Sequence, residues 1–274
     1  MTTLMVRLEL GQSNAKVLTI VGDLAKQLDA GVVGVAVCQP LRMAYGDSYL
    51  SGDVIQADRE GIENETATAE AEFRTALEPV VKKLDFRSAI TFEPLSDNLA
   101  RQARIADIIV TAVERRGFLL NSSRHLNVSD LLMQAGRPVL IVPANLEVFR
   151  LDRVLVGWKD TRETRRAVLD ALPVLRKAGH VTVVEIADGQ DLDAAHARLA
   201  EVTAWLHDHG VDAGALVELA AGDDASRLGA IAAEQRADLI VAGAYGHNRF
   251  REWALGGVTS DLLLRAGKCS LVSH

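Results

Sequence analysis

An internal repeat constrains the fold of this 274-residue chain more than any other feature of its sequence. Residues 106–110, ADIIV, return as residues 237–241, ADLIV, at an offset of 131 residues. At the same offset, and without a gap, the segment 129–132, SDLL, returns unchanged at 260–263. Self-similarity at a fixed offset indicates that one structural module occurs twice.

The early parts of the two copies correspond less strongly, at an offset of 148 residues, with Leu8 to Val33 alongside Val156 to Val181. The first copy therefore carries about 17 extra residues in its middle. We place the join near residues 145–150 and predict two domains, residues 1–147 and residues 148–274.

Within each copy, short apolar β-branched runs alternate with helical periodicity. The first copy predicts strands and helices in the order strand 4–10, helix 14–28, strand 32–38, helix 54–84, strand 87–93, helix 98–106, strand 108–113, helix 128–135, strand 139–142. The second predicts strand 153–157, helix 162–177, strand 180–186, helix 192–209, strand 215–219, helix 225–236, strand 239–242, a helix after Gly257, and strand 270–273. Strands separated by helices imply right-handed crossovers and a parallel sheet with helices on both faces, an α/β doubly wound fold.

Glycines cluster after the strand 239–242, at Gly243, Gly246, Gly256 and Gly257, and a helical pattern follows from Val258. Glycine lets a ligand approach the backbone closely, and free N–H groups at the start of a helix favour an anion. The order of strand, glycine loop and helix therefore indicates a phosphate-binding loop. The alternative is that these glycines only form a turn and a helix start.

The spacing G-x2-G-x9-G resembles the nucleotide-binding signature of the universal stress protein family. Gly243, Gly246 and Gly256 match that signature, Gly257 stands where the family has Ser or Thr, and Val258 and Thr259 resemble its continuation. The resemblance covers the whole chain as a tandem pair. It implies that each module is a five-stranded parallel sheet of order 3-2-1-4-5, and that the cofactor is ATP or a related adenine nucleotide, with or without Mg²⁺.

The same resemblance extends the expected site to the first two strands of the second module. The family has an aspartate near the ribose, but here Lys159 takes its place in the run Gly157-Trp158-Lys159-Asp160-Thr161. Lysine cannot accept a hydrogen bond from a ribose hydroxyl, although it could pair with a phosphate, and Asp160 could reach the ribose instead. Ile186 falls where the family contacts adenine through its backbone.

The first module departs from the signature at every glycine position. Ala112 and Arg115 stand where the second module has Gly243 and Gly246, and His125 and Leu126 stand where it has Gly256 and Gly257. Side chains would fill the space that a phosphate needs. We therefore predict that the first module has lost nucleotide binding and is structural. The alternative is that Arg115, Arg116, Arg124 and His125 meet an anion through their side chains.

Charge and residue types narrow the function further. A net charge of −7 argues against a nucleic-acid binder, and Cys38 and Cys269 are expected to be reduced core residues. No apolar run approaches the ~20 residues of a membrane span, and no signal peptide is expected, so we predict a cytoplasmic protein.

His207 and His209 resemble a metal pair, but residues i and i+2 on a helix face different directions, so no metal site is predicted. No catalytic constellation stands out.

We therefore predict a stress-response regulator that is not an enzyme and that binds one adenine nucleotide in its C-terminal module. The alternatives are a nucleotide-free interaction scaffold and a slow nucleotide hydrolase. Residues 139–142 and 270–273 form apolar strands at the sheet edge of each module. An exposed apolar edge invites pairing, so we expect the two strands to pair antiparallel in an intramolecular pseudo-dimer. A further homodimer through other surfaces stays open.

Overall fold

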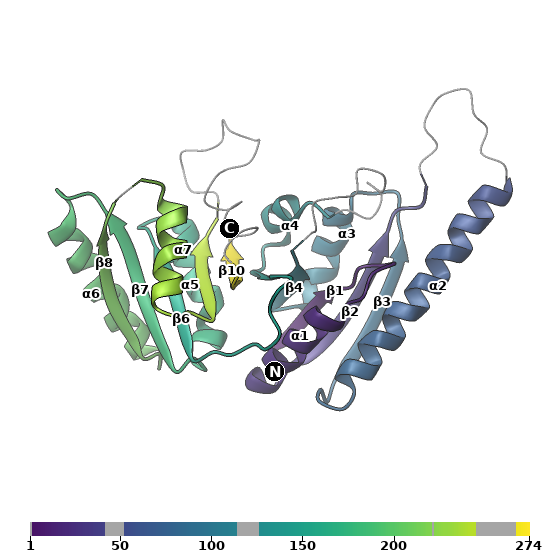
Figure 1. The fold of residues 1–274 in the computed structure, drawn as a ribbon, viewed down its shortest axis with the longest axis horizontal. Helices are drawn as coiled ribbons and strands as arrows, with labels where there is room; N and C mark the ends of the chain where they lie inside the picture. The colour runs from purple at the N-terminus through teal and green to yellow at the C-terminus, as the bar shows by residue number, and fades with distance from the viewer. Residues whose placement is uncertain (1, 42–51, 114–125, 221, 245–266) are drawn as a thin grey trace, which may run out of the picture. The chain divides into compact units, whose positions relative to one another are not determined.

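The computed structural model describes residues 2–41, 52–113, 126–220, 222–244 and 267–274 (Figure 1). Contacts divide the chain into two compact units, Met1–Gly136 and Arg137–His274. The predicted domain boundary after residue 147 concerns the sequence repeat and stays a prediction. By contacts the last strand of the first repeat falls in the second unit.

The first unit is a parallel sheet of order β3-β2-β1-β4 with helices against it. Its elements are β1 (Thr3–Arg7), α1 (Ala15–Leu28), β2 (Gly31–Cys38), α2 (Gly52–Leu77), β3 (Leu84–Ile90), α3 (Leu95–Gln102), the short 3₁₀ helix η1 (Ala103–Ile105), β4 (Ile108–Ala112) and α4 (Val128–Ala135). Helix α2 lies beside β3 in Figure 1. Phe73 of α2 is fully buried because Gly34 of β2 has no side chain, and its ring occupies that space.

The described residues of the second unit form six strands in the order β5-β10-β9-β6-β7-β8. Its elements are β5 (Val139–Val142), β6 (Arg153–Trp158), α5 (Arg162–Leu175), β7 (His180–Ala187), α6 (Leu192–Asp208), β8 (Ala213–Leu219), α7 (Asp224–Glu234), β9 (Leu239–Gly243) and β10 (Cys269–Ser273). The strands of the second repeat follow the predicted order 3-2-1-4-5 and are parallel, which confirms the doubly wound α/β fold.

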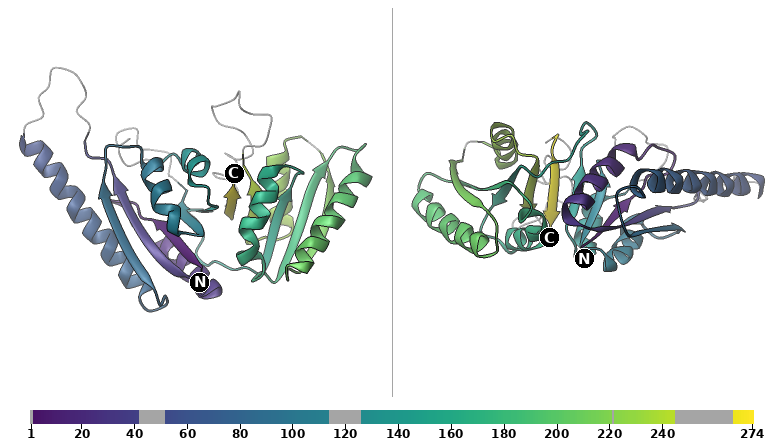
Figure 2. Two further views of the ribbon diagram at one scale, coloured as in Figure 1. Left: turned by 180° about the vertical axis from the view of Figure 1, so that it is seen from behind. Right: turned by 90° about the horizontal axis from the view of Figure 1, so that it is seen from below.

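Helices cover both faces of this sheet. Helix α7 packs on the face that carries Leu155, Val184 and Ile240, and it lies toward the viewer in Figure 1. Helices α5 and α6 lie on the opposite face, which Figure 2 shows from behind. Arg198 of α6 holds Glu185 of β7 on that face with hydrogen bonds to both carboxylate oxygens. Strand β7 is therefore enclosed from both sides, as its apolar sequence predicts.

The two fifth strands pair antiparallel, as predicted. Leu140 of β5 lies opposite Leu271 of β10, between the pairs Ile141–Ser270 and Val139–Val272. All four residues of β5 are buried. The apolar edge strand of each repeat is thus covered by the edge strand of the other repeat, so neither strand is open to pairing with another chain.

The repeat is visible in individual hydrogen bonds. Asp107 precedes β4 and accepts a hydrogen bond from the backbone N–H of Thr3 at 2.8 Å. Asp238 precedes β9 and accepts the same bond from the N–H of Arg153 at 2.9 Å. Thr3 and Arg153 therefore occupy equivalent positions at the start of the first strand of each repeat, and the offset at this strand is 150 residues rather than the predicted 148.

Two predicted helices have the wrong bounds. The expected helix to Leu84 ends at Leu77, and β3 begins at Leu84. Pro79 has no N–H and disfavours helical backbone at the residue before it, so the chain turns there. The predicted helix 98–106 likewise begins earlier, at Leu95. The predicted helix after Gly257 lies outside the described residues. No helix in the described ranges is both long and apolar enough to cross a membrane.

Both cysteines are core residues, as expected. Cys38 ends β2 and Cys269 begins β10, and each is almost completely buried. Burial, with a smaller contribution from the charge of Asp238, raises the pKa of the Cys269 thiol to about 12. A thiol with that pKa stays protonated and unreactive near neutral pH.

Candidate functional site

The carboxyl ends of β6 and β9 form the reversal point of the sheet order in the second unit. Strand β6 lies between β9 and β7, and Gly157 of β6 lies opposite Ala242 of β9. In doubly wound sheets, ligands bind in the crevice outside the carboxyl ends of the strands at such a point. Of the predicted site residues, Gly157, Lys159, Asp160, Ile186 and Gly243 are described, and the structure places all five at carboxyl ends of β6, β7 and β9 or just beyond them.

The glycine that ends β9 has a packing role. A Cβ added to Gly243 would lie 2.6 Å from the carbonyl carbon of Glu163 and 2.6 Å from the nitrogen of Thr164. The missing side chain thus admits the first turn of α5 to the end of the strand. At Gly157 a Cβ would lie 2.9 Å from Cδ2 of Leu228, so this glycine similarly admits α7. Both glycines are explained by helix packing before any ligand is considered.

Two charged residues follow β6 in the loop to α5. Lys159 is 77% exposed, and its Nζ lies 3.8 Å from Oδ2 of Asp224 in the first turn of α7. Asp160 is 55% exposed, and its Oδ1 accepts a hydrogen bond of 2.6 Å from Arg165 of α5. Exposed ion pairs contribute little to stability, so a ligand can replace either partner at small cost.

Trp158, the last residue of β6, carries a buried indole N–H. Its Nε1 is buried and has no hydrogen-bond partner among the described residues. A buried indole N–H usually has an acceptor, and leaving it unpaired costs roughly 1–3 kcal/mol. Sequence reasoning did not single out Trp158, because nothing in the sequence shows which way the indole nitrogen points.

Glu163 is a second residue that the sequence did not reveal. It lies in the first turn of α5, is 2% exposed, and accepts a hydrogen bond of 2.5 Å from Nε of Arg162. Burial by itself raises the pKa of this carboxyl, but hydrogen bonds from Arg162, its own backbone N–H and Thr161 outweigh burial, and the pKa lies below its ordinary value. The helix dipole also favours an ionised carboxylate in the first turn of a helix. The carboxylate of Glu163 therefore provides a negative charge at the amino-terminal end of α5.

Ile186 occupies the position expected for contact with a base. Its side chain packs against the apolar cluster beneath α7, which includes Val184 and Leu228. With the side chain turned into the core, its backbone is the part of the residue that remains for a ligand at the end of β7.

The remaining predicted site residues cannot be placed. Gly246, Gly256, Gly257, Val258 and Thr259 lie outside the described residues. The same holds for two residues of the first repeat, Arg115 and His125. Their roles remain predictions from the sequence.

In the first repeat, a carboxylate of the chain itself binds the turn between the first strand and the first helix. Glu72 of α2 accepts hydrogen bonds from Oγ of Ser13 at 2.7 Å and from the backbone N–H of Asn14 at 2.9 Å, at the start of α1. Ala112 ends β4 at the position of Gly243, and Leu126 is buried. The carboxylate of Glu72 therefore caps α1, and α2 is tied to the first strand–helix turn.

The two histidines near the end of α6 are accounted for by the helix terminus. The backbone N–H of Ala213 donates to Nε2 of His207 at 3.2 Å, and Nδ1 of His209 lies 2.8 Å from the carbonyl oxygen of Trp205. The rings thus serve different backbone partners rather than a common ion. In the described ranges no group of three or more potential metal-ligating side chains comes together.

The comparisons with known proteins identify the fold. No protein-family model matches the sequence, and no curated protein does. A universal stress protein from Archaeoglobus fulgidus matches over 98% of this chain and 97% of its own, with a TM-score of 0.76 and 19% identity. A universal stress protein candidate from Pseudomonas aeruginosa matches over 99% and 92%, with a TM-score of 0.64 and 15% identity.

A shorter structure matches one half of the chain. It is a universal stress protein from Archaeoglobus fulgidus in complex with dAMP, and it covers 52% of this chain and 97% of its own, with a TM-score of 0.33 and 16% identity. The two full-length matches show that the fold of this chain is a tandem pair of doubly wound α/β modules. The chain has the fold of a tandem universal stress protein.

Proposed function

We propose that this chain is a nucleotide-binding regulator of the universal stress protein type, with one adenine-nucleotide site at the carboxyl ends of β6 and β9. The observation that carries the proposal is the exposed pair of charged residues, Lys159 and Asp160, just beyond the carboxyl end of β6 at the reversal point of the sheet. The G-x2-G-x9-G spacing that begins at Gly243 supports it from the sequence.

These groups fit the chemistry of an adenine nucleotide. Such a ligand is rich in acceptors, namely phosphate oxygens and ring nitrogens, and the exposed ammonium of Lys159 is a donor at the reversal point. The hydroxyls of the ribose need an acceptor, which Lys159 cannot supply. Asp160 can, because only its Oδ1 is engaged by Arg165. Mg²⁺, where present, would be held largely by phosphates and water.

The proposed role is binding and regulation rather than catalysis. A bound triphosphate is a signal that the chain can report to a partner, and none of the groups assigned here has to act as a base. The loop glycines would provide backbone N–H groups for the phosphates. The first repeat, with Glu72 at the start of α1 and Ala112 in place of Gly243, would be structural.

Calorimetric titration with ATP tests this proposal. Gly246→Asp and Gly256→Val each place a side chain in the proposed phosphate path and should weaken binding at least about tenfold, or by roughly 1.4 kcal/mol. The repeat supplies matched controls, since Arg115→Asp and His125→Val change the equivalent positions and should leave the affinity unchanged. Equal binding by all four variants would place the site elsewhere. An unaltered protein that binds no adenine nucleotide would favour the scaffold.

A further inference from the structure

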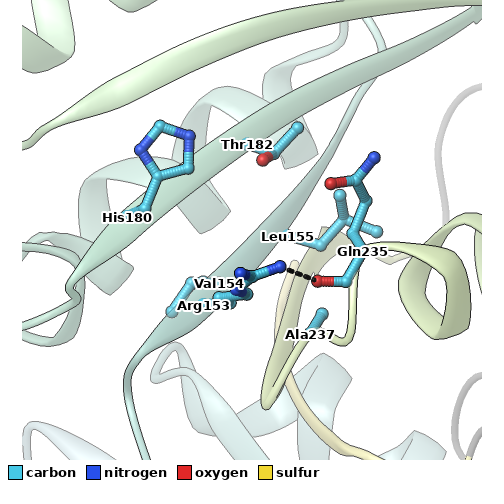
Figure 3. Close-up of a pocket in the computed structure, with 7 residues that line it drawn as sticks. All are labelled: Arg153, Val154, Leu155, His180, Thr182, Gln235 and Ala237. Carbon is cyan, nitrogen blue, oxygen red and sulfur yellow. Dashed lines mark hydrogen bonds between the residues drawn. The ribbon is translucent and has the colours of Figure 1, made fainter.

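A second hollow lies at the opposite, amino-terminal ends of β6 and β7, on the face covered by α7 (Figure 3). We call it the amino-edge pocket, and its cavity has a volume of about 250 Å³. Leu155 and Ala237, both buried, contribute apolar surface. Arg153, His180, Thr182 and Gln235 contribute polar groups, and Figure 3 shows these four side chains around a common space.

The pocket exists because the covering helix stops short. Helix α7 ends at Glu234, and Arg236 adopts left-handed backbone with φ 53°, which turns the chain toward β9. The amino ends of β6 and β7 are left without a helix above them. On the neighbouring strand β8, Gly214 lies opposite Thr182, and because it has no side chain the ring of His180 lies over it.

The polar groups are held in place before any ligand arrives. The guanidinium of Arg153 donates to the carbonyl oxygen of Gln235 at 3.2 Å, and this bond fixes the side chain against the end of α7. Nδ1 of His180 lies 3.1 Å from Oδ2 of Asp212. Groups that are already ordered lose little entropy on binding, which favours recognition of a small ligand.

Donors predominate in this pocket. Arg153 has further guanidinium N–H groups beyond the one bonded to Gln235, and Thr182 and the Gln235 amide add donors of their own. The carboxylates of Asp212 and Asp238 beside the lining residues each have a partner, Asp212 with His180 and Asp238 with the backbone N–H of Arg153. A planar guanidinium matches a carboxylate with two parallel hydrogen bonds.

The first repeat provides an internal comparison. The strand registers place Thr3, Gly31 and Val33 at the positions of Arg153, His180 and Thr182. Val33 is 6% exposed and belongs to the core. The backbone hydrogen bond to the aspartate is common to both repeats, whereas the cation, the imidazole and the hydroxyl occur only in the second. The shared fold therefore does not require these polar side chains.

We propose that the amino-edge pocket binds a small organic carboxylate, whose charged group pairs with Arg153 and whose apolar part rests on Leu155 and Ala237. A cavity of about 250 Å³ lies below the ~300–1,000 Å³ of typical ligand pockets, which fits a short-chain or single-ring carboxylate better than a nucleotide. The pocket lies at the amino-terminal ends of the strands, whereas the proposed nucleotide site lies at their carboxyl ends. Failure of one proposal would therefore leave the other untouched.

Benzoate is a suitable probe for the full chain, and amide chemical shifts in ¹H–¹⁵N NMR spectra are a suitable readout. Benzoate should shift the amides of Thr182, Gln235 and Ala237 with a Kd on the order of 1 mM, as its size allows. Neutral benzamide has the same shape and should bind at least about tenfold more weakly.

Variants taken from the first repeat keep the fold intact. Arg153→Thr imports the residue found at Thr3, retains the backbone bond to Asp238, and should weaken benzoate binding at least about tenfold. Thr182→Val imports Val33 and should weaken it less, because it removes one hydroxyl. The control Arg166→Thr removes an equal charge from the exposed face of α5 and should have no effect.

Three results would overturn the proposal. The first is no shift of the lining amides at about 10 mM benzoate, since a ligand with a Kd near 1 mM would then be about nine-tenths bound. The second is equal binding of benzamide and benzoate. The third is an unchanged benzoate affinity in Arg153→Thr.

Discussion

Replacing Gly243 by alanine separates two reasons for a glycine at the end of β9. If the glycine serves only a ligand, the ligand-free protein should tolerate a methyl group there. The structure predicts otherwise, because the added Cβ would lie 2.6 Å from two backbone atoms of the first turn of α5, one in Glu163 and one in Thr164. Backbone cannot rotate away as a side chain does, so α5 must shift.

The expected loss follows from the cost of overpacking. Forcing an extra methyl group into a packed site costs about 1–3 kcal/mol, and backbone contacts belong at the upper end of that range. The smaller conformational freedom of alanine in the unfolded chain returns about 0.4–1 kcal/mol. The net loss should be about 2 kcal/mol, which lowers the Tm of the second unit by roughly 8 °C.

Scanning calorimetry and urea unfolding of the ligand-free protein measure this loss. Gly229→Ala is the matched control, because Gly229 lies within α7 and an added Cβ meets nothing within 4 Å. That change should stabilise the protein by about 0.5–1 kcal/mol. Gly157→Ala meets the end of the flexible Leu228 side chain and should fall between the two. If Gly243→Ala is as stable as Gly229→Ala, the packing argument is refuted.

Three further predictions concern other parts of the chain. Glu72→Ala removes the cap of α1 and should lower the free energy of unfolding, measured in urea, by about 1–2 kcal/mol. The control Glu70→Ala changes an exposed residue of the same helix and should alter stability by less than about 0.5 kcal/mol. Equal losses in the two variants would contradict the capping role. Lys159→Gln should weaken ATP binding about fivefold at low salt and AMP binding by a smaller factor, which titration calorimetry can measure. An equal loss of affinity for ATP and AMP would exclude a phosphate contact. With a pKa of about 12, the thiol of Cys269 should stay unreactive toward a thiol reagent at pH 8 until the protein unfolds, and rapid labelling of the native protein would contradict its burial.

Much of the fold follows from local sequence patterns. The helix Val128–Ala135 has the predicted bounds, because Asn127 caps its start with two hydrogen bonds and Gly136 ends it in left-handed backbone. The strand Val139–Val142 is likewise where its apolar run predicts. The end of α2 does not follow from the helical pattern, because that pattern continues past Leu77, whereas Pro79 ends the helix in the structure.

The candidate site could be predicted only in part. The position at the carboxyl ends of β6 and β9 follows from strand order, and a glycine at 243 follows from the motif spacing. The packing reason for Gly243 does not, since it depends on the approach of α5. The burial of Glu163 and the burial of the Trp158 indole nitrogen could not be predicted either. Each depends on how elements far apart in the sequence pack together in the folded unit.

The number of nucleotides bound per chain tests the central claim most directly. Native mass spectrometry of the intact chain, purified and mixed with an excess of ATP, resolves each bound nucleotide as a separate mass. An intact site in the second repeat and a structural first repeat predict a complex with one adenine nucleotide per chain and no second addition. A chain that stays free of nucleotide, or one that binds two, would contradict the account.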